Sequence, residues 1–131
     1  MTNLTEEARQ DMDALASRLF EAIERADIAA VEQIYAPDVE YWVNFTDQTQ
    51  GLDTILEMTR LFSQKVKDLH YEIQSREFFP GGFVQRCRIT GQLASGEVLA
   101  VPLCLIIYVK DGRITRLYEY INVASFMPIF A

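Results

Sequence analysis

Several markers of common protein classes are absent from this chain of 131 residues. No apolar run reaches 18 residues, which excludes a membrane-spanning helix. The sequence contains no Gly-rich phosphate loop, no nucleotide-binding fingerprint and no nucleophile elbow. Its single histidine, His70, and its acidic residues form no cluster with metal-ligand spacing. We therefore expect no metal and no cofactor, and we expect His70 to face solvent.

Cysteine is scarce, and the first residues do not form a secretory signal. Cys87 and Cys104 lie in expected strands with a spacing that fits no metal motif, so we interpret them as free, reduced thiols. The N-terminal segment is acidic and polar, and it lacks the basic start and apolar stretch of a signal peptide. These observations predict a cytoplasmic protein.

Positive charge is also limited and unevenly placed. The formal net charge is −7; residues 1–60 carry 13 acidic and 4 basic side chains, whereas residues 61–131 carry 6 acidic and 8 basic ones. No Lys/Arg cluster is available to neutralise phosphates. An acidic helical half and a nearly neutral strand half argue against nucleic acid and anionic membranes as partners.

The chain is rich in apolar residues. Hydrophobic residues make up 50% of it and aromatic residues 11%, which excludes disorder and predicts one domain over residues 1–131 with a substantial core. In the first half, apolar residues recur at three- and four-residue spacing, which indicates amphipathic helices. Asn3 and Asp27 are suited to capping helices, and Pro37 disfavours helical geometry in the residue before it. The expected helices cover residues 3–26, 27–36 and 52–67.

From Asp68 onward the apolar period changes to two, which predicts strands. Ser95-Gly96 and Asp111-Gly112 are hairpin-turn signals. With an earlier aromatic segment included, the expected strands cover residues 38–45, 69–74, 83–93, 98–109 and 114–123. The order predicts an α+β fold in which three N-terminal helices close a curved, mostly antiparallel, cone-shaped sheet over an apolar pocket.

One strand also predicts an oligomer. Residues 98–109 are apolar on both alternating sets, as expected of a strand that is buried on both faces. Because the helices cover only one face of the sheet, we expect a second copy of the chain to cover the other face and form a homodimer.

The element order, together with Asp111-Gly112-Arg113-Ile114-Thr115 leading into Tyr118-Glu119-Tyr120, resembles the SnoaL-like branch of the nuclear transport factor 2-like superfamily. The resemblance covers about residues 5–126. It implies a cystatin-like α+β barrel, dimeric through its sheet, with a deep lipophilic pocket. The superfamily includes polyketide cyclases, ketosteroid isomerase, limonene epoxide hydrolase, dehydratases and non-catalytic binders, so the fold does not name the reaction.

Limonene epoxide hydrolase supplies the catalytic pattern that is most similar to this sequence. In that family a Tyr-x-Asn pair and an Asp on the last strand hold a water molecule, and an Arg-x-Asp pair connects the base to the epoxide oxygen. Here Asn44 matches the Asn, Trp42 replaces the Tyr, and Arg86 matches the Arg. Glu119 stands where the basic Asp would be, and Arg88 occupies the position of the acid that protonates the opening ring. Ketosteroid isomerase fits less well, since residues 43–44 and 103–105 supply no carboxylate.

These residues receive candidate roles. Glu119 would be the base and Arg86 would orient it; Arg88 or Trp42 would stabilise charge on a substrate oxygen, and Asn44 would position water or substrate. Whether Glu119 and Arg86 share a face depends on the register of the strands. Two-residue loops at both hairpins put them on opposite faces, whereas one bulge, or a three-residue loop at residues 94–96, brings them together.

Three functions remain open at this point. The leading hypothesis is a cofactor-independent enzyme that acts on a small lipophilic molecule by proton abstraction or water addition, as an isomerase, cyclase, dehydratase or hydrolase. The alternatives are a non-catalytic module that binds a lipophilic ligand in the same pocket, and a dimeric scaffold whose pocket is filled by the apolar tail at residues 126–130. An inward-facing, paired Glu119 with an open pocket favours the first. An inward pocket without an ionisable group favours the second, and a pocket filled by residues 126–130 favours the third.

Overall fold

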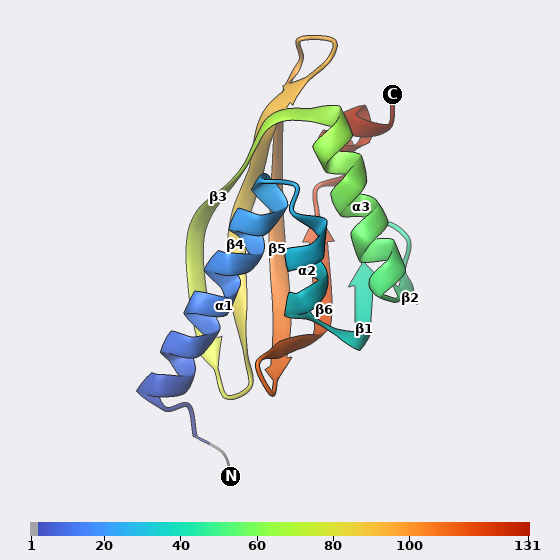
Figure 1. Cartoon of the computed structure of the whole chain (residues 1–131). Coiled ribbons are helices and arrows are strands. Elements are labelled where there is room, and N and C mark those ends of the chain that lie inside the picture. Colours follow the sequence, from blue (N-terminus) through green and yellow to red (C-terminus); the bar gives the residue numbers. More distant parts are fainter. Residues whose placement is uncertain (1–2) are drawn as a thin grey trace.

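The computed structural model describes residues 3–131, and Figure 1 shows its helices lying on one face of a long, curved sheet. Within those residues the sheet has six strands in the order β2-β1-β6-β5-β4-β3. Neighbouring strands are antiparallel except for β1 and β6, which run parallel. The predicted α+β fold is therefore confirmed.

The helices are α1 (Glu6–Glu24), α2 (Ile28–Ile34), α3 (Leu52–Lys65) and the short α4 (Val123–Phe126), followed by a 3₁₀ turn, η1 (Met127–Phe130). The strands are β1 (Tyr35–Val43), β2 (Gln48–Gln50), β3 (Val66–Phe79), β4 (Gly82–Leu93), β5 (Val98–Lys110) and β6 (Arg113–Ile121).

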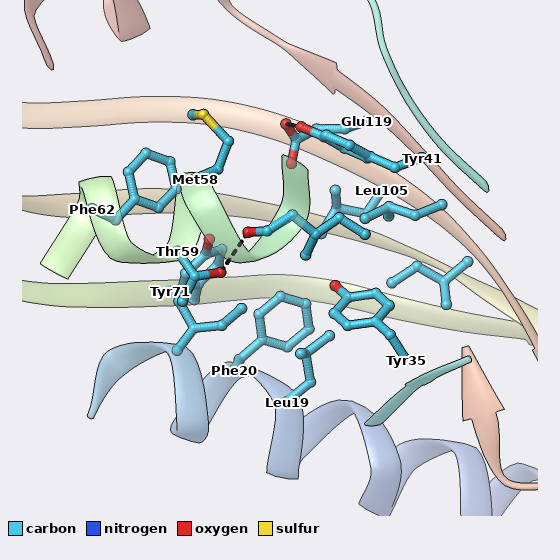
Figure 2. A pocket seen from close by; sticks show the side chains of 14 residues that line it. Leu19, Phe20, Tyr35, Tyr41, Met58, Thr59, Phe62, Tyr71, Leu105 and Glu119 are labelled. Atoms are coloured by element: carbon cyan, nitrogen blue, oxygen red, sulfur yellow. Dashed lines mark hydrogen bonds between the residues drawn. The ribbon is translucent and has the colours of Figure 1, made fainter. Parts of the chain in front are cut away.

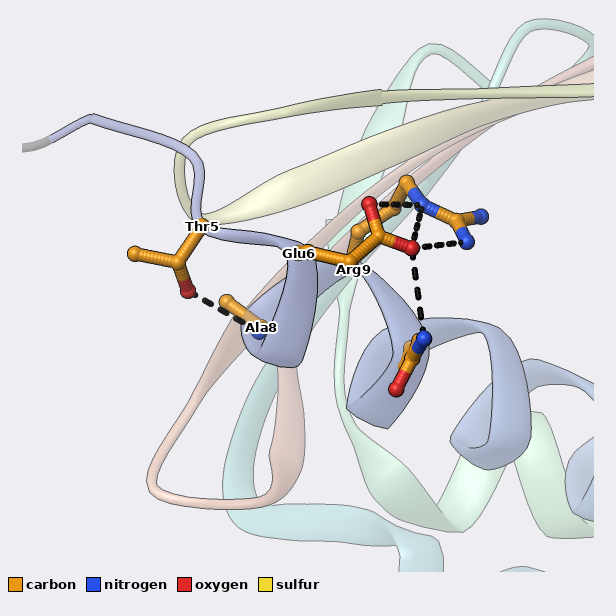
Figure 3. A network of polar contacts seen from close by, with 5 residues as sticks. Thr5, Glu6, Ala8 and Arg9 are labelled. Carbon is orange, nitrogen blue, oxygen red and sulfur yellow. Dashed lines mark hydrogen bonds and ion pairs between the residues drawn. The ribbon is translucent and has the colours of Figure 1, made fainter.

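The first helix begins later than the sequence predicts. Thr5, not Asn3, is its N-cap, and the Thr5 hydroxyl accepts a hydrogen bond from the backbone N–H of Ala8 at 3.0 Å (Figure 3). Thr5 has extended backbone angles, as a capping residue requires. Glu6 then forms an exposed ion pair with Arg9 on the first turn (Figure 3). The positive end of the helix dipole also stabilises a carboxylate at this position.

The second helix starts as predicted but ends earlier. The Asp27 carboxylate accepts a hydrogen bond from the N–H of Ala30 at 3.1 Å and caps α2. The chain becomes extended at Tyr35, so Pro37 lies inside β1 and not at the helix end. The pairing of β1 with β6 is irregular between Tyr35 and Glu40, which is where a proline without an N–H is tolerated. Strand β2, in the segment expected to be a loop, pairs with the end of β1.

The core lies between the helices and the concave face of the sheet. Alternate residues of each long strand point into it, and they pack against the apolar stripes of α1, α2 and α3. None of the helices within residues 3–131 is long and apolar enough to cross a membrane. Among the largest fully buried side chains are those of Leu19, Val31, Phe83, Ile89, Ile107 and Ile114.

No helix of residues 3–131 covers the convex face of the sheet (Figure 1), and a row of aromatic residues lies on that face. Trp42 on β1 packs against Tyr118 and Tyr120 on β6, with ring centroids 6.3 and 5.1 Å away. Tyr108 on β5 continues this row and contacts Tyr118 at 6.2 Å. Tyr108 and Tyr120 are exposed, so residues 3–131 leave this side of β5 and β6 partly uncovered.

The C-terminal segment packs beside α3 (Figure 1). Phe126 is buried, and its ring lies 5.7 Å from that of Phe62 on α3 and 5.8 Å from that of Phe45. Asn122 caps α4 by accepting a hydrogen bond from the N–H of Ser125. The segment belongs to the core and contributes no residue to the lining of the cavity described below.

Candidate active site

Glu119 lies on β6 and points into the space between the sheet and the helices (Figure 2). It borders a cavity of about 50 Å³. Most of the wall is apolar: α1 contributes Leu19 and Phe20, and α3 contributes Met58 and Phe62. The polar groups of the lining are Glu119, three tyrosine hydroxyls and the Thr59 hydroxyl, which donates to the backbone carbonyl of Ile55 at 2.9 Å.

Tyr41 is the direct partner of the Glu119 carboxylate. Its hydroxyl donates a hydrogen bond to Oε2 of Glu119 at 3.0 Å (Figure 2). Tyr41 precedes Trp42 on β1, so the two side chains point to opposite faces of the sheet. The inward aromatic residue on this strand is thus Tyr41, and Trp42, the residue singled out from the sequence, lies on the convex face.

Burial sets the acidity of Glu119. Removal from water raises its pKa from 4.5 to about 7, and the hydrogen bond from Tyr41 opposes the rise by favouring the ionised form. The residue is half-buried and lines the cavity. Near neutral pH such a carboxyl group is divided between acid and base forms, which suits a group that takes and returns a proton.

Arg86 is not brought together with Glu119. On the sheet, Glu119 pairs with Leu105, and Leu105 pairs with Gln85 on β4; Arg86 therefore points to the opposite, convex face and is exposed. The expected pairing of the two residues is not found.

The register explains why that expectation failed. The loop of the β4–β5 hairpin has three residues, because the N–H of Leu93 bonds the carbonyl of Glu97. The β5–β6 ladder also slips by one residue, since Val109 pairs with Ile114 but Tyr108 pairs with Arg116. Either offset alone would place Arg86 and Glu119 on one face, and the two together cancel.

The other candidate residues also lie away from the cavity. Arg88 shares the convex face with Arg86 and pairs with Glu72 across the ladder. The Asn44 side chain is bound to the backbone of Ile121: its amide donates to the carbonyl at 3.2 Å, and its oxygen accepts from the N–H at 3.1 Å. Asn44 thus extends the β1–β6 pairing beyond the end of β1. His70 is exposed and contacts Glu24.

Sequence reasoning missed the tyrosines of the cavity. Tyr35, Tyr41 and Tyr71 all line it, from both ends of β1 and from β3 (Figure 2). Tyr41 alternates along β1 with Val39 and Val43, and all three side chains are buried. Because alternate residues of a strand point to the same face, this pattern marks Tyr41 as inward-facing. In the described part of the chain no group of three His, Cys, Asp or Glu residues has the arrangement of a metal site.

Comparison with known proteins agrees with this architecture. The family model described as the SnoaL-like domain matches residues 16–117. No curated protein sequence matches the chain. Among solved structures, it is similar to AclR from Streptomyces galilaeus, a proposed hydroxylase, with a TM-score of 0.81 at 16% identity, covering 91% of this chain and 83% of that one.

Two further structures show the same fold. IdmH from Streptomyces antibioticus, a proposed polyketide cyclase, gives a TM-score of 0.79 at 15% identity, covering 90% of this chain and 96% of that one. PrhC from Penicillium brasilianum gives a TM-score of 0.81 at 11% identity, covering 92% of this chain and 86% of that one. A curved sheet covered on one face by helices is the architecture that this chain shares with these structures, and it is the nuclear transport factor 2-like fold. Within that fold class the chain belongs to the SnoaL-like domain family.

Proposed function

We propose that this chain is an enzyme that uses Glu119 as a general base on a small lipophilic molecule bound in the cavity. The observation that carries this proposal is a carboxyl group in an apolar cavity, held by one tyrosine and with a pKa of about 7. Packing alone does not require a carboxylate at this position, where a leucine or methionine would bury more apolar surface.

The environment of Glu119 favours proton acceptance. An ionised carboxylate in an apolar wall is poorly solvated, so protonation removes an unfavourable charge and makes Glu119 a stronger base than a carboxylate in water. Tyr41 keeps the group oriented by donating to one oxygen, which leaves the other oxygen available to a substrate. A positioned base of this kind contributes about 10²- to 10⁴-fold to a rate.

The reaction class is proton abstraction from carbon or activation of water, leading to isomerisation, cyclisation, dehydration or hydrolysis. The epoxide-hydrolase pattern is not carried into the proposal, because Arg86 and Arg88 lie on the convex face, away from the cavity. The apolar wall favours a lipophilic substrate. A cavity of about 50 Å³ lies well below the roughly 300–1,000 Å³ of drug-sized ligand sites, so a large substrate requires movement of α3 side chains such as Met58 and Phe62.

Hydrogen exchange tests the proposal without a known substrate. The protein is incubated in D₂O with a panel of small ketones, and deuterium incorporation beside the carbonyl is followed by mass spectrometry. We expect exchange of at least one ketone with the wild type and a loss of about 10²-fold or more in Glu119→Gln. Equal exchange by both proteins would contradict a base role for Glu119 and leave the non-catalytic binding module as the better description.

We also propose that the convex face is the contact between two copies of the chain. Its exposed aromatic residues on β5 and β6, with the Arg116–Glu40 ion pair beside them, resemble the apolar centre and polar rim of a subunit interface. Light scattering should give twice the chain mass of 15.1 kDa at micromolar concentration. Tyr118→Glu should shift the protein towards the single-chain mass, and a single-chain mass for the wild type would contradict the proposal.

A further inference from the structure

Two buried tyrosines that line the cavity have hydroxyls without a partner among residues 3–131. Tyr35 is 3% exposed and Tyr71 is 7% exposed. Tyr41 hydrogen-bonds Glu119, but within residues 3–131 neither the Tyr35 nor the Tyr71 hydroxyl makes a hydrogen bond. No completely enclosed side-chain oxygen or nitrogen of the described residues lacks a partner. The two hydroxyls therefore keep some accessible surface, and both residues line the cavity.

The two residues approach the cavity from different elements. Tyr35 stands at the start of β1, directly after α2, and Tyr71 lies on β3, where its ring packs 4.9 Å from that of Phe20. In Figure 2 the hydroxyl of Tyr35 is directed towards the other lining side chains. Burial first, and the charge of Glu119 second, raise the pKa of both tyrosines, so both remain neutral hydrogen-bond donors at physiological pH.

Packing does not explain these hydroxyls. Phenylalanine would supply the same ring without a polar atom, and burying a hydroxyl without a partner is unfavourable. The neighbouring Thr59 shows the contrast, since its buried hydroxyl is satisfied by the Ile55 carbonyl. The cavity thus has unused donors at Tyr35 and Tyr71, while its one charged acceptor, Glu119, already receives a hydrogen bond from Tyr41.

We propose that Tyr35 and Tyr71 bind the acceptor oxygen of a small carbonyl ligand in this cavity. A carbonyl oxygen has two lone pairs and no hydrogen, so it matches a site with two free donors. A hydrocarbon of the same shape would leave both hydroxyls buried and unpaired, so the pair selects oxygenated ligands over hydrocarbons. The assignment deepens the proposed function, on which it rests for the catalytic meaning of the site, although the binding claim can be tested separately.

The test compares two small probes that differ by the oxygen. Cyclopent-2-enone and cyclopentene are titrated into the protein, and binding is followed by NMR shifts of cavity methyl groups. Tyr35→Phe and Tyr71→Phe should each weaken the binding of cyclopentenone by about 2- to 12-fold, the scale of one neutral hydrogen bond, and should leave the binding of cyclopentene unchanged. Tyr118→Phe, on the convex face, is the matched control and should change neither.

A stability measurement separates ligand binding from a structural role. Because the Tyr35 and Tyr71 hydroxyls have no partner in the described part of the chain, their phenylalanine variants should melt at or above the wild-type temperature. Equal weakening of both probes, no weakening of either, or failure of the wild type to bind cyclopentenone up to its solubility limit would each overturn the proposal.

The outcome is distinguishable from that of the proposed function. If Glu119→Gln abolishes deuterium exchange while the tyrosine variants bind cyclopentenone normally, the base role stands and the oxygen subsite is wrong. If the tyrosine variants lose affinity for cyclopentenone but Glu119→Gln exchanges normally, the subsite stands and the base role is wrong.

Discussion

Substituting Glu119 with Gln should stabilise the protein, and the gain should grow with pH. Glutamine keeps the shape of the side chain and an oxygen that accepts the hydrogen bond from Tyr41, but it carries no charge. The unfolded chain loses the proton of Glu119 near pH 4.5, whereas the folded chain holds it to about pH 7. Between these values the folded state binds more protons, so this carboxyl group lowers stability as pH rises through that window and has no further effect above it.

The magnitude follows from the two pKa values. One pKa unit corresponds to about 1.4 kcal/mol, so ionising Glu119 in the folded protein costs up to about 3 kcal/mol above pH 7. At pH 5.5 only about 1 kcal/mol of this cost is present. Water that reaches the cavity would reduce both figures. For a chain of 131 residues, 3 kcal/mol corresponds to about 10 °C in melting temperature.

Thermal melts of both proteins from pH 5.5 to 8.5 measure the effect, since this range avoids aggregation near the isoelectric point of about 4.6. The difference in unfolding free energy should rise from about 1 to about 3 kcal/mol across the range. Glu40→Gln, which removes a carboxylate exposed on the convex side, is the control and should show no such rise. A stability difference that is constant with pH would refute the argument that Glu119 is a desolvated carboxyl group.

Three other outcomes are expected. Tyr41→Phe removes the hydrogen bond that lowers the pKa of Glu119, so the acid limb of a pH–rate profile should move to higher pH. Thr5→Ala removes the cap of α1 and should lower the unfolding free energy by about 1 kcal/mol in a denaturant titration. Burial raises the pKa of the Cys87 thiol to about 11, so a thiol reagent should leave Cys87 unmodified until the protein unfolds, as peptide mapping would show.

The elements with strong local signals were predictable from the sequence. The Asp111-Gly112 turn is an example: both residues have positive φ, of 52° and 75°, as a tight two-residue hairpin requires, and aspartate and glycine tolerate that geometry. Asp27 capped its helix as predicted. In each case the signal and the structure lie within four residues of one another, so tertiary packing has little opportunity to override it.

Boundaries and caps were less predictable because competing local options have similar energies. Thr5 and Asn3 both have side chains that cap helices, and local sequence preference does not distinguish them, although Thr5 is the cap in the structure. Pro37 can stand where the pairing of a strand is interrupted, as between Tyr35 and Glu40, as well as at the end of a helix. The short strand β2 has polar residues that resemble a loop, and only its pairing with β1 identifies it.

The faces of the sheet on which Glu119 and Arg86 lie show which kind of sequence argument is reliable for strands. Pairing Arg86 with Glu119 required counting residues across two turns, and each turn or bulge can shift the count by one and reverse the face. Alternation within β6 crosses no turn. Glu119 alternates with Leu117 and Ile121, which are buried, whereas Arg116 and Tyr120, on the other set, are exposed. The inward direction of Glu119 therefore follows from its own strand, while the identity of its partner, Tyr41, depends on the parallel pairing of β1 with β6, for which the chain has no local signal.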